Sequence, residues 1–560
     1  MPLNQSNDSE KPCLVETSKG FSVSYKNKLL YSKYDPKKSI LQIINSLHLL
    51  EGTLILCLSP ALWYGLEELL KSLPAKCFIL GIEQDPLLYE FSSKRLQELT
   101  KGQNIPVKMI SPEELNEFSE IFSDLKKSDL KIPAIHSFKR AIPIEMSGGV
   151  LFSKDFYNNF SLTTENIIAS FWKNRITLVK MGRVYSRNLF HNLAKLPNSM
   201  LFQDFTKKVE CPIIVIGAGQ SAESTINFLK AGNSHKYYIL AVDAALPALR
   251  KNGIEPDGVV ALECQLAIEK AYIGGISENT VLFADITSRP HVTEIAKNVC
   301  FFATRFSNAT FFDSLSKEMF FPMTLPPLGS VGPAAVLIAL YLKKSSNVPV
   351  FVTGLDFSFS LGATHMRGVP AHLQRLCSTT RLKPVANYDA AFKPGAVAIT
   401  GKNGDKIITD TALHGYAENF TSAFKAIPSL FDIGETGLPL GIQTACLQNI
   451  SDDFLTTKDF IQTENQKNKK YSTKILSFLE EEERALNRLK ELLMFGKDVQ
   501  SCSCTIEEEL EQILKNREYL YLHFPDGYDC DIGNISFLKR IRTEIDFFIK
   551  DIKKGIAKLS

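Results

Sequence analysis

The residues best suited to chemistry begin with a glycine-rich turn, "GAGQS", at residues 217–221. Branched apolar residues precede it and a helix-like pattern follows, which is typical of a buried strand that turns into a helix. Gly217 permits the turn, Gly219 lets a phosphate approach the main chain, and Ser221 can cap the helix or donate to a phosphate oxygen. The turn predicts a nucleotide-phosphate site, with glycines used only for packing as the alternative.

Acidic residues follow the next two strand-like runs. Asp243 ends "ILAVD" and Glu263 ends "GVVALE". An acid directly after a strand can accept hydrogen bonds from ribose hydroxyls, or it can cap the helix that follows. Because Ala222 can replace the third glycine of the dinucleotide fingerprint, Asp243 also fits a nicotinamide-dependent oxidoreductase. Both roles stay open at this point.

A second glycine turn, "GSVG" at residues 329–332, opens an apolar helix. Two helix N-termini beside one cleft could share the charge of one nucleotide phosphate. Gly329, Ser330 and Gly332 are the candidate residues of this turn. The alternative is a Pro/Gly loop before a buried helix, with Pro333 near the first turn.

An acid and a histidine follow the run "VFVTGL". Asp356 comes directly after it, and His365 lies nine residues later in a loop that contains glycine. Loops at the ligand edge of a sheet often carry function, and a neutral histidine can accept a proton near pH 7. His365 is therefore a candidate general base, against the commoner case of a surface histidine with no role.

A single sheet can position all of these residues. Strand-like runs alternate with helix-like runs from residue 209 to 450: "PIIVIG", "YYILAVD", "GVVALE", "TVLFADI", "NVCFFAT" and "VPVFVTGLD". Continuous apolar strands that alternate with helices predict an α/β domain with a mostly parallel sheet covered on both faces. Ligands of such sheets bind at the carboxyl ends of the strands, where these residues lie.

Three further parts complete the predicted organisation. Residues 1–130 have a βαβ pattern typical of a Rossmann-like domain, but the turn "LSPALW" lacks the glycine that a phosphate needs, so we expect no ligand there. Residues 131–208 are expected to be a connector that is helical in its second half. Residues 451–560 have apolar residues at helical spacing with charges between them, which predicts a helical C-terminal region.

Composition narrows the class of protein. The chain has 560 residues with a net charge of +3, which is not the excess of positive charge typical of proteins that bind nucleic acid. There is no signal-like start and no stretch of 18 apolar residues, so we expect no membrane association. The eleven cysteines are scattered, several within apolar runs, and they are typical of free thiols in a reducing compartment. These features favour the cytoplasm, and no metal site is indicated.

The order of the motifs is more specific than any one of them. "GAGQS", then "AVDAALPALRKNGIEPDGVVALE", then "GSVGPAAVLIALYL" and "VFVTGLDFSFSLGATHMRG" resemble the motility accessory factor (Maf) family. Its members are bacterial flagellin glycosyltransferases whose central domain is also called pterin-pyrophosphokinase-like. The resemblance covers residues 209–444 and extends more loosely to "YSKYDPKKSI" near the start. The "GLDF" segment is also similar to bacterial sialyltransferases that use CMP-sugars.

The resemblance implies transfer of a nonulosonic acid, of the pseudaminic or legionaminic type, from a CMP donor to Ser or Thr hydroxyls of flagellin, in support of flagellum assembly and motility. No cofactor is required besides this donor, and a homo-oligomer is compatible with it. The implied nucleotide and sugar contacts are Gly217, Gly219, Ser221, Asp243, Glu263, Gly329, Ser330 and Gly332, with Asp356 and His365 near the reacting centre.

Two departures from the family pattern leave the exact donor open. Gln220 and Ala222 flank Ser221 where the family commonly has Gly-x-Gly-Pro-Ser-Leu, and Glu263 stands where an Asp is usual. The alternatives that remain are a pterin pyrophosphokinase-like enzyme, a dinucleotide-dependent enzyme, and a non-catalytic chaperone that binds flagellin.

Overall fold

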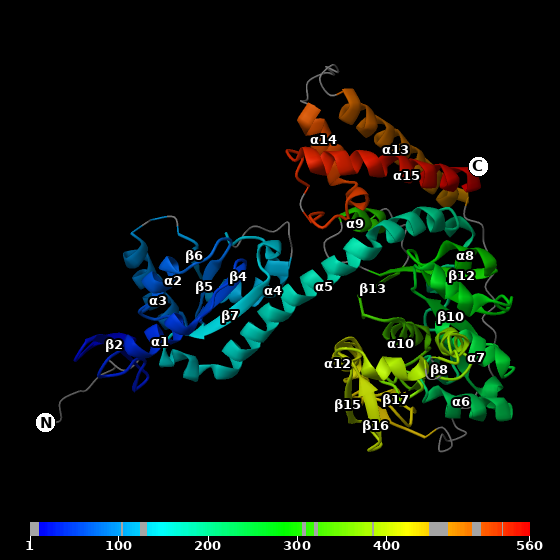
Figure 1. The fold of residues 1–560 in the computed structure, drawn as a ribbon, viewed down its shortest axis with the longest axis horizontal. Coiled ribbons are helices and arrows are strands. Elements are labelled where there is room, and N and C mark those ends of the chain that lie inside the picture. The colour runs from blue at the N-terminus through cyan, green and yellow to red at the C-terminus, as the bar shows by residue number, and fades with distance from the viewer. Residues whose placement is uncertain are drawn as a thin grey trace. The chain divides into compact units, whose positions relative to one another are not determined.

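The computed structural model of the protein contains two compact units, Met1–Lys180 and Met181–Ser560. Figure 1 colours the first blue to cyan and the second from green to red. The residues that the structure describes are 11–101, 103, 105–123, 131–304, 310–317, 323–382, 386–446, 469–495, 506–528 and 530–559.

The first unit contains a parallel four-stranded sheet in the order β6-β5-β4-β7. This confirms the predicted Rossmann-like domain. Its strands are β4 (Thr53–Leu58), β5 (Phe78–Ile82), β6 (Val107–Ile110) and β7 (Arg140–Glu145), and its helices are α1 (Lys38–Ser46), α2 (Leu66–Lys71), α3 (Pro86–Thr100) and α4 (Pro112–Ser123). A smaller antiparallel sheet precedes it, formed by β1 (Cys13–Thr17), β2 (Gly20–Tyr25) and β3 (Lys28–Leu29).

This sheet extends past the boundary drawn at residue 130. Strand β7 pairs in parallel with β4, from Thr53 opposite Arg140 to Leu58 opposite Glu145. The run "RAIPIE" is half polar and contains a proline, because β7 is an edge strand, and the sequence pattern therefore hid it. The connector is corrected accordingly: its helical part is α5 (Lys154–Leu193), which begins in the first unit and ends in the second.

Side chains occupy the carboxyl edge of this first sheet. Ser59, directly after β4, donates from Oγ to Glu83 Oε2 at 2.7 Å, and the Tyr157 hydroxyl donates to Glu83 Oε1 at 2.6 Å. Glu83 is buried, and a Cβ added at Gly149 would lie 2.2 Å from Ser59 Oγ. The acid after β5 is thus hydrogen-bonded by side chains of the protein itself.

The second unit contains a nine-stranded sheet, which confirms the predicted mostly parallel α/β domain. Its order is β13-β12-β11-β10-β9-β8-β14-β17-β18, and every neighbouring pair is parallel. The strands are β8 (Ile213–Ile216), β9 (Tyr238–Val242), β10 (Gly258–Ala261), β11 (Val281–Asp285), β12 (Asn298–Thr304), β13 (Thr324–Leu325), β14 (Val350–Thr353), β17 (Leu430–Asp432) and β18 (Gln443–Thr444).

The strand order reverses between β8 and β14, because the chain runs outward from β8 to β13 and then returns to the other side. Such a switch point is where open α/β sheets bind ligands. The helices described between residues 209 and 446 are α6 (Ala222–Phe228), α7 (Leu246–Lys251), α8 (Pro290–Ile295), α9 (Thr310–Lys317), α10 (Val331–Leu342), α11 (Pro370–Cys377) and α12 (Thr411–Phe424). A hairpin of β15 (Val397–Thr400) and β16 (Lys406–Thr409) is inserted after α11.

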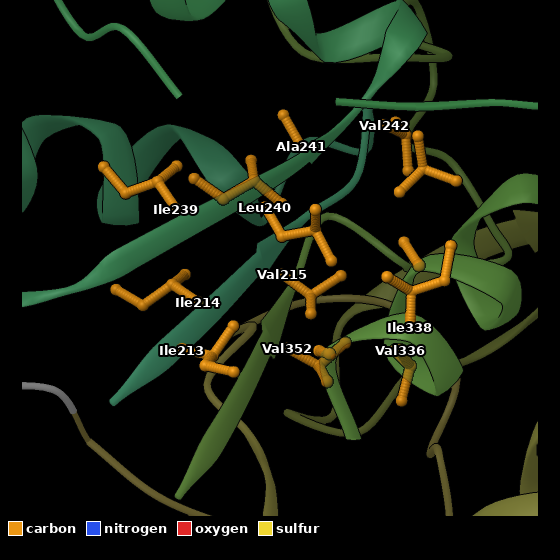
Figure 2. Close-up of a cluster of buried hydrophobic side chains, with 14 of the residues drawn as sticks. Ile213, Ile214, Val215, Ile239, Leu240, Ala241, Val242, Val336, Ile338 and Val352 are labelled. Carbon is orange, nitrogen blue, oxygen red and sulfur yellow. The ribbon is translucent and has the colours of Figure 1, made fainter. Parts of the chain in front are cut away.

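Branched apolar side chains form the core around the switch point. Figure 2 shows side chains of β8, β9 and β14 gathered with those of α10. The residues labelled there are Ile213, Ile214, Val215, Ile239, Leu240, Ala241, Val242, Val336, Ile338 and Val352, and all are buried. Strands buried on both faces need such continuous apolar runs, which is why the sequence pattern revealed them.

The described residues of the C-terminal region are mainly helical, as predicted, with α13 (Lys469–Phe495), α14 (Ile506–Lys515) and α15 (Ile535–Leu559), while residues 451–468 and 496–505 lie outside the described residues. The end of α5 joins α15 to the central sheet. Arg187 Nε donates to Asp551 Oδ2 at 2.8 Å, while Asn188 Nδ2 donates to the carbonyl oxygens of Cys264 and Thr287 at 3.1 and 3.0 Å. Among the described residues, no helix has both the length and the apolar content needed to cross a membrane.

Candidate functional site

The first glycine turn lies at the switch point and packs against the turn that follows β14. Gly217 N–H donates to Thr353 O and Gly219 N–H to Gly354 O, both at 2.8 Å. A Cβ at Gly217 would lie 2.2 Å from Gly354 O, and a Cβ at Gly219 would lie 2.5 Å from Asp356 Oδ2. These two glycines therefore allow the turns after β8 and β14 to come into direct contact.

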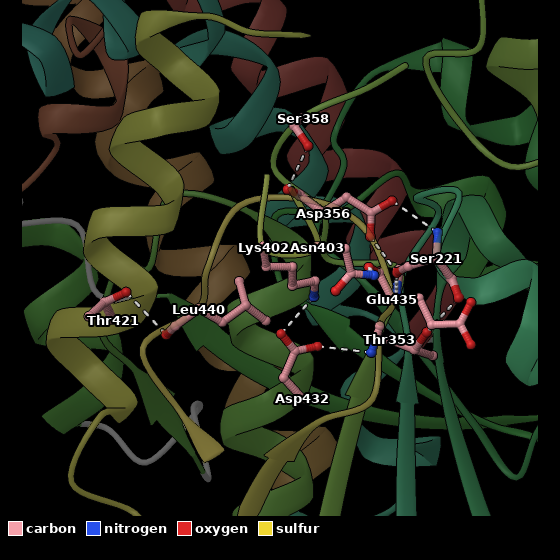
Figure 3. A network of polar contacts seen from close by, with 12 residues as sticks. Ser221, Thr353, Asp356, Ser358, Lys402, Asn403, Thr421, Asp432, Glu435 and Leu440 are labelled. Carbon is pink, nitrogen blue, oxygen red and sulfur yellow. Dashed lines mark hydrogen bonds and ion pairs between the residues drawn. The ribbon is translucent and has the colours of Figure 1, made fainter. Parts of the chain in front are cut away.

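The anion held at this turn in the structure is the carboxylate of Asp356. Ser221 N–H donates to Asp356 Oδ2 at 3.0 Å, and the Ser221 hydroxyl donates to Asp356 Oδ1 (Figure 3). Gly354 N–H donates to Ser221 Oγ at 2.8 Å. Ser221 makes no capping hydrogen bond, and α6 has only seven residues. Ser221 thus connects the two turns through Asp356.

Burial raises the pKa of Asp356, although the hydrogen bonds from Ser221 and the charge of Lys402 oppose this shift. Lys402 comes from the hairpin, and its Nζ lies 2.6 Å from Oδ2 of Asp432, the last residue of β17. Only 12% of the Lys402 side chain and 5% of the Asp432 side chain are exposed. A buried ion pair therefore lies beside Asp356.

Sequence reasoning missed this ion pair. Asp432 ends a strand-like run, "LFD", so the rule that selected Asp243 could have found it. Lys402 lies in the hairpin turn "GKNGD", which carries no periodic signal. Gly437 packs closely against Asp356. Its φ is +110°, and a Cβ there would lie 2.7 Å from Asp356 Cα.

The second glycine turn meets the first at one side chain. A Cβ at Gly332 would lie 2.4 Å from Leu355 Cδ2, and a Cβ at Gly217 would lie 2.6 Å from the same atom. Gly329 has a φ of +84° and lies beside Tyr416 of α12. Ser330 is the N-cap residue of α10 but makes no side-chain capping hydrogen bond. The structure therefore brings the two predicted turns together.

Asp243 lies after β9 with one oxygen unpaired. Its Oδ1 accepts from Ala244 N–H at 2.7 Å, while Oδ2 is buried and has no hydrogen-bond partner among the described residues. Burial, with a smaller contribution from the charge of Glu263, raises the pKa of Asp243 to about 7. The Tyr272 hydroxyl is also buried and unpaired within the described residues. Unsatisfied buried polar atoms are rare, so both groups are candidates for a contact with a ligand or an ordered water.

Two further acids at strand ends have different surroundings. Glu263 is exposed, and its Oε1 accepts from Gln265 N–H at 3.0 Å. Asp285 accepts from the N–H and hydroxyl groups of both Thr287 and Thr304, which joins the ends of β11 and β12. Asp285 is therefore structural, whereas Glu263 remains accessible at the carboxyl edge.

The His365 loop is bound to the first glycine turn. Met366 N–H donates to Ala218 O at 3.0 Å, so its neighbour His365 lies near this turn. Burial, followed by the charge of Arg375 and a smaller contribution from His372, lowers the pKa of His365. His365 is consequently neutral near pH 7, which is the form that accepts a proton.

Comparisons with known proteins cover both the central domain and the whole chain. A family model described as 6-hydroxymethylpterin diphosphokinase MptE-like matches residues 187–362, which include both glycine turns and Asp356. A protein of Treponema pallidum (strain Nichols), described as uncharacterized, is 31% identical over 562 residues, with 96% of this chain and 94% of that protein covered. A solved MAf glycosyltransferase from Magnetospirillum magneticum AMB-1 has a TM-score of 0.49 and 13% identity, covering 98% of this chain and 90% of that chain.

Proposed function

From two findings we propose that this protein is a glycosyltransferase. The chain belongs to the family of the Treponema pallidum protein, and it has the MptE-like central domain that its resemblance to Maf proteins implies. It moves a nonulosonic acid, pseudaminic or legionaminic, from a CMP donor to Ser or Thr hydroxyls of flagellin. The observation that carries the proposal is the meeting of both glycine turns, through Leu355, with the His365 loop at the switch point. Nucleotides bind at this place in α/β sheets.

In the proposed reaction, the oxygen of the acceptor hydroxyl forms a bond to the anomeric carbon of the sugar. His365 accepts the proton that this hydroxyl loses. The bond from that carbon to the phosphate oxygen breaks, and CMP leaves with the electron pair. A neutral histidine suits the first step, and the lowered pKa of His365 supports this role. Glu263, exposed at the same edge, is the second candidate base.

Asp356 acts in this proposal mainly by position. Its carboxylate is hydrogen-bonded to the Ser221 N–H and hydroxyl, and its carbonyl oxygen accepts from Leu438 N–H at 2.9 Å. It thereby fixes the turn beside which the His365 loop is bound. Direct phosphate binding by Ser221 would require its hydrogen bond to Asp356 to open. Asp243, with its unpaired Oδ2, is the proposed partner of donor hydroxyls.

A second candidate function is pyrophosphoryl transfer to a hydroxymethylpterin, which the description of the matching family model favours. The two reactions give different products. Purified protein with ATP, magnesium and 6-hydroxymethylpterin would release AMP, whereas the proposed transferase would release CMP from a CMP-nonulosonate only when flagellin is present.

The decisive experiment is the intact mass of flagellin from cells with and without this protein. We expect flagellin from cells without it to be lighter by whole nonulosonic acid residues. His365→Ala expressed in the same cells should leave flagellin at the lighter mass. Equal masses in all three would contradict the transferase, and full modification by His365→Ala would exclude His365 as the base.

A further inference from the structure

Two basic side chains on α11 have buried nitrogen atoms without a partner. Arg375 Nη1 and His372 Nδ1 are inaccessible to solvent and make no hydrogen bond within the described residues. Neither side chain forms an ion pair with a described carboxylate. An arginine whose N–H group is desolvated and unpaired is costly, which points to an anionic partner.

The position of α11 places these groups at the carboxyl edge of the sheet. His372 and Arg375 are three residues apart, so they share one face of the helix. Before α11, a Cβ at Gly368 would lie 3.6 Å from Ala248 Cα in α7. Within α11, Gln374 Oε1 accepts from Lys270 Nζ at 3.4 Å.

These contacts attach α11 and its preceding loop to three places on the sheet edge. The loop is bound to the turn after β8 through Met366, and it lies against α7, which follows β9. Helix α11 contacts the short helical segment Leu266–Tyr272, which carries the unpaired Tyr272 hydroxyl. Basic groups of α11 and unpaired polar groups of the strand ends are thus brought to one edge.

His365 lies within this basic group. Its loop leads directly into α11 and is held at the first glycine turn by Met366, and Arg375 and His372 both contribute to the lowered pKa of His365. In contrast, the anion position of the glycine turn is already filled by Asp356. An incoming phosphate therefore finds unpaired nitrogen atoms on α11, those of Arg375 and His372.

We propose that Arg375 and His372 bind the phosphate of the nucleotide donor, beside the proposed base His365, while Asp243 and Tyr272 bind hydroxyl groups of the same ligand. This inference rests on the proposed function for the identity of the nucleotide. The phosphate chemistry is independent of it, because a guanidinium and an imidazole recognise any phosphate ester. Arg375 is then a binding residue of the site that sequence reasoning did not single out.

Isothermal titration of the full-length protein with CMP, cytidine and inorganic phosphate tests the proposal. Wild type should bind CMP more tightly than cytidine. Arg375→Gln should weaken CMP binding about 10- to 100-fold, the effect of losing a hydrogen bond to a charged group, and leave cytidine binding unchanged. Arg375→Lys should give an intermediate loss, because it keeps the charge without the planar fork.

Arg367→Gln is the matched control, since Arg367 lies in the loop just before α11, with its side chain 86% exposed and beside Glu223. It should bind CMP as wild type does. Equal affinity of wild type for CMP and cytidine, or wild-type CMP affinity in Arg375→Gln, overturns the proposal. Arg375-dependent binding of inorganic phosphate without flagellin modification in cells supports the phosphate site and rejects the transferase function.

Discussion

At the scale of single residues, His365 carries the clearest prediction. His365→Ala should lower the transfer rate on the order of 100- to 10,000-fold, because a positioned base is lost. The rate of wild type should fall only as pH drops through the lowered pKa of His365, below its ordinary value of about 6.5. Steady-state kinetics of CMP release across pH measures both effects.

CMP affinity and melting temperature are the controls for His365→Ala, and both should stay near wild type. If His365→Ala transfers sugar at the normal rate, another residue must be the base, and Glu263 is the next candidate.

Asp243 predicts an unusual pH dependence of stability. Its pKa is raised to about 7 in the folded protein, so the folded state holds this proton more tightly than the unfolded state. The contribution of Asp243 to the free energy of unfolding is therefore most favourable below pH 4, and it is lost as pH rises from about 4 through 7. Asp243→Asn should melt higher than wild type at pH 8, with the difference shrinking toward pH 5. A constant difference in thermal unfolding at both pH values would contradict this assignment.

At the scale of elements, the contact between the turns after β8 and β14 can be tested through Gly219. A methyl group there would lie 2.5 Å from Asp356 Oδ2, so Gly219→Ala must displace the carboxylate. We expect a loss of about 1–3 kcal/mol in the free energy of unfolding, together with weaker CMP binding. Gly415→Ala is the control, because Gly415 lies in α12 with nothing within 4 Å of an added Cβ. Equal denaturant midpoints for the two variants would exclude the clash.

The ion pair between Lys402 and Asp432 predicts a double-mutant result. Lys402→Met leaves a buried carboxylate unpaired and should cost about 3–5 kcal/mol of unfolding free energy. Adding Asp432→Leu should recover most of that loss, since both charges are then absent. Lys344→Met removes an exposed partner of Glu210 and should cost less than about 1 kcal/mol. Additive losses in urea unfolding would show that Lys402 and Asp432 do not interact.

At the scale of the whole molecule, Asp551 attaches the C-terminal helices to α5. Burial alone would raise its pKa, but hydrogen bonds from His191 and Arg187 outweigh burial and lower it to about 2. The stabilisation is therefore present above pH 4 and is lost as pH falls through about 2. Asp551→Asn should lower unfolding free energy at pH 7 by about 2 kcal/mol. Denaturant unfolding at pH 7 and pH 3 should show this difference shrinking at the lower pH.

Most of the central sheet was predictable because its strands are continuous apolar runs, such as "IIVI" at β8. The order of the strands in this sheet was not predictable, since the edge strands β13 and β18 have two residues each and carry no pattern in the sequence. The candidate site was predictable where an acid or glycine follows a strand, as at Gly217 and Asp356. The pairing of Asp356 with Ser221 depends on residues 135 positions apart, which no local pattern encodes.

The carboxylate held at the first glycine turn has a consequence for selectivity. Asp356 is tethered within reach of Ser221, so it competes for that position like a ligand at very high local concentration. A free anion from the surrounding solution, even in molar excess, has to displace a competitor that cannot diffuse away. Ordinary buffer anions should therefore not replace Asp356 at this turn, and only a ligand that also binds elsewhere along its length can do so.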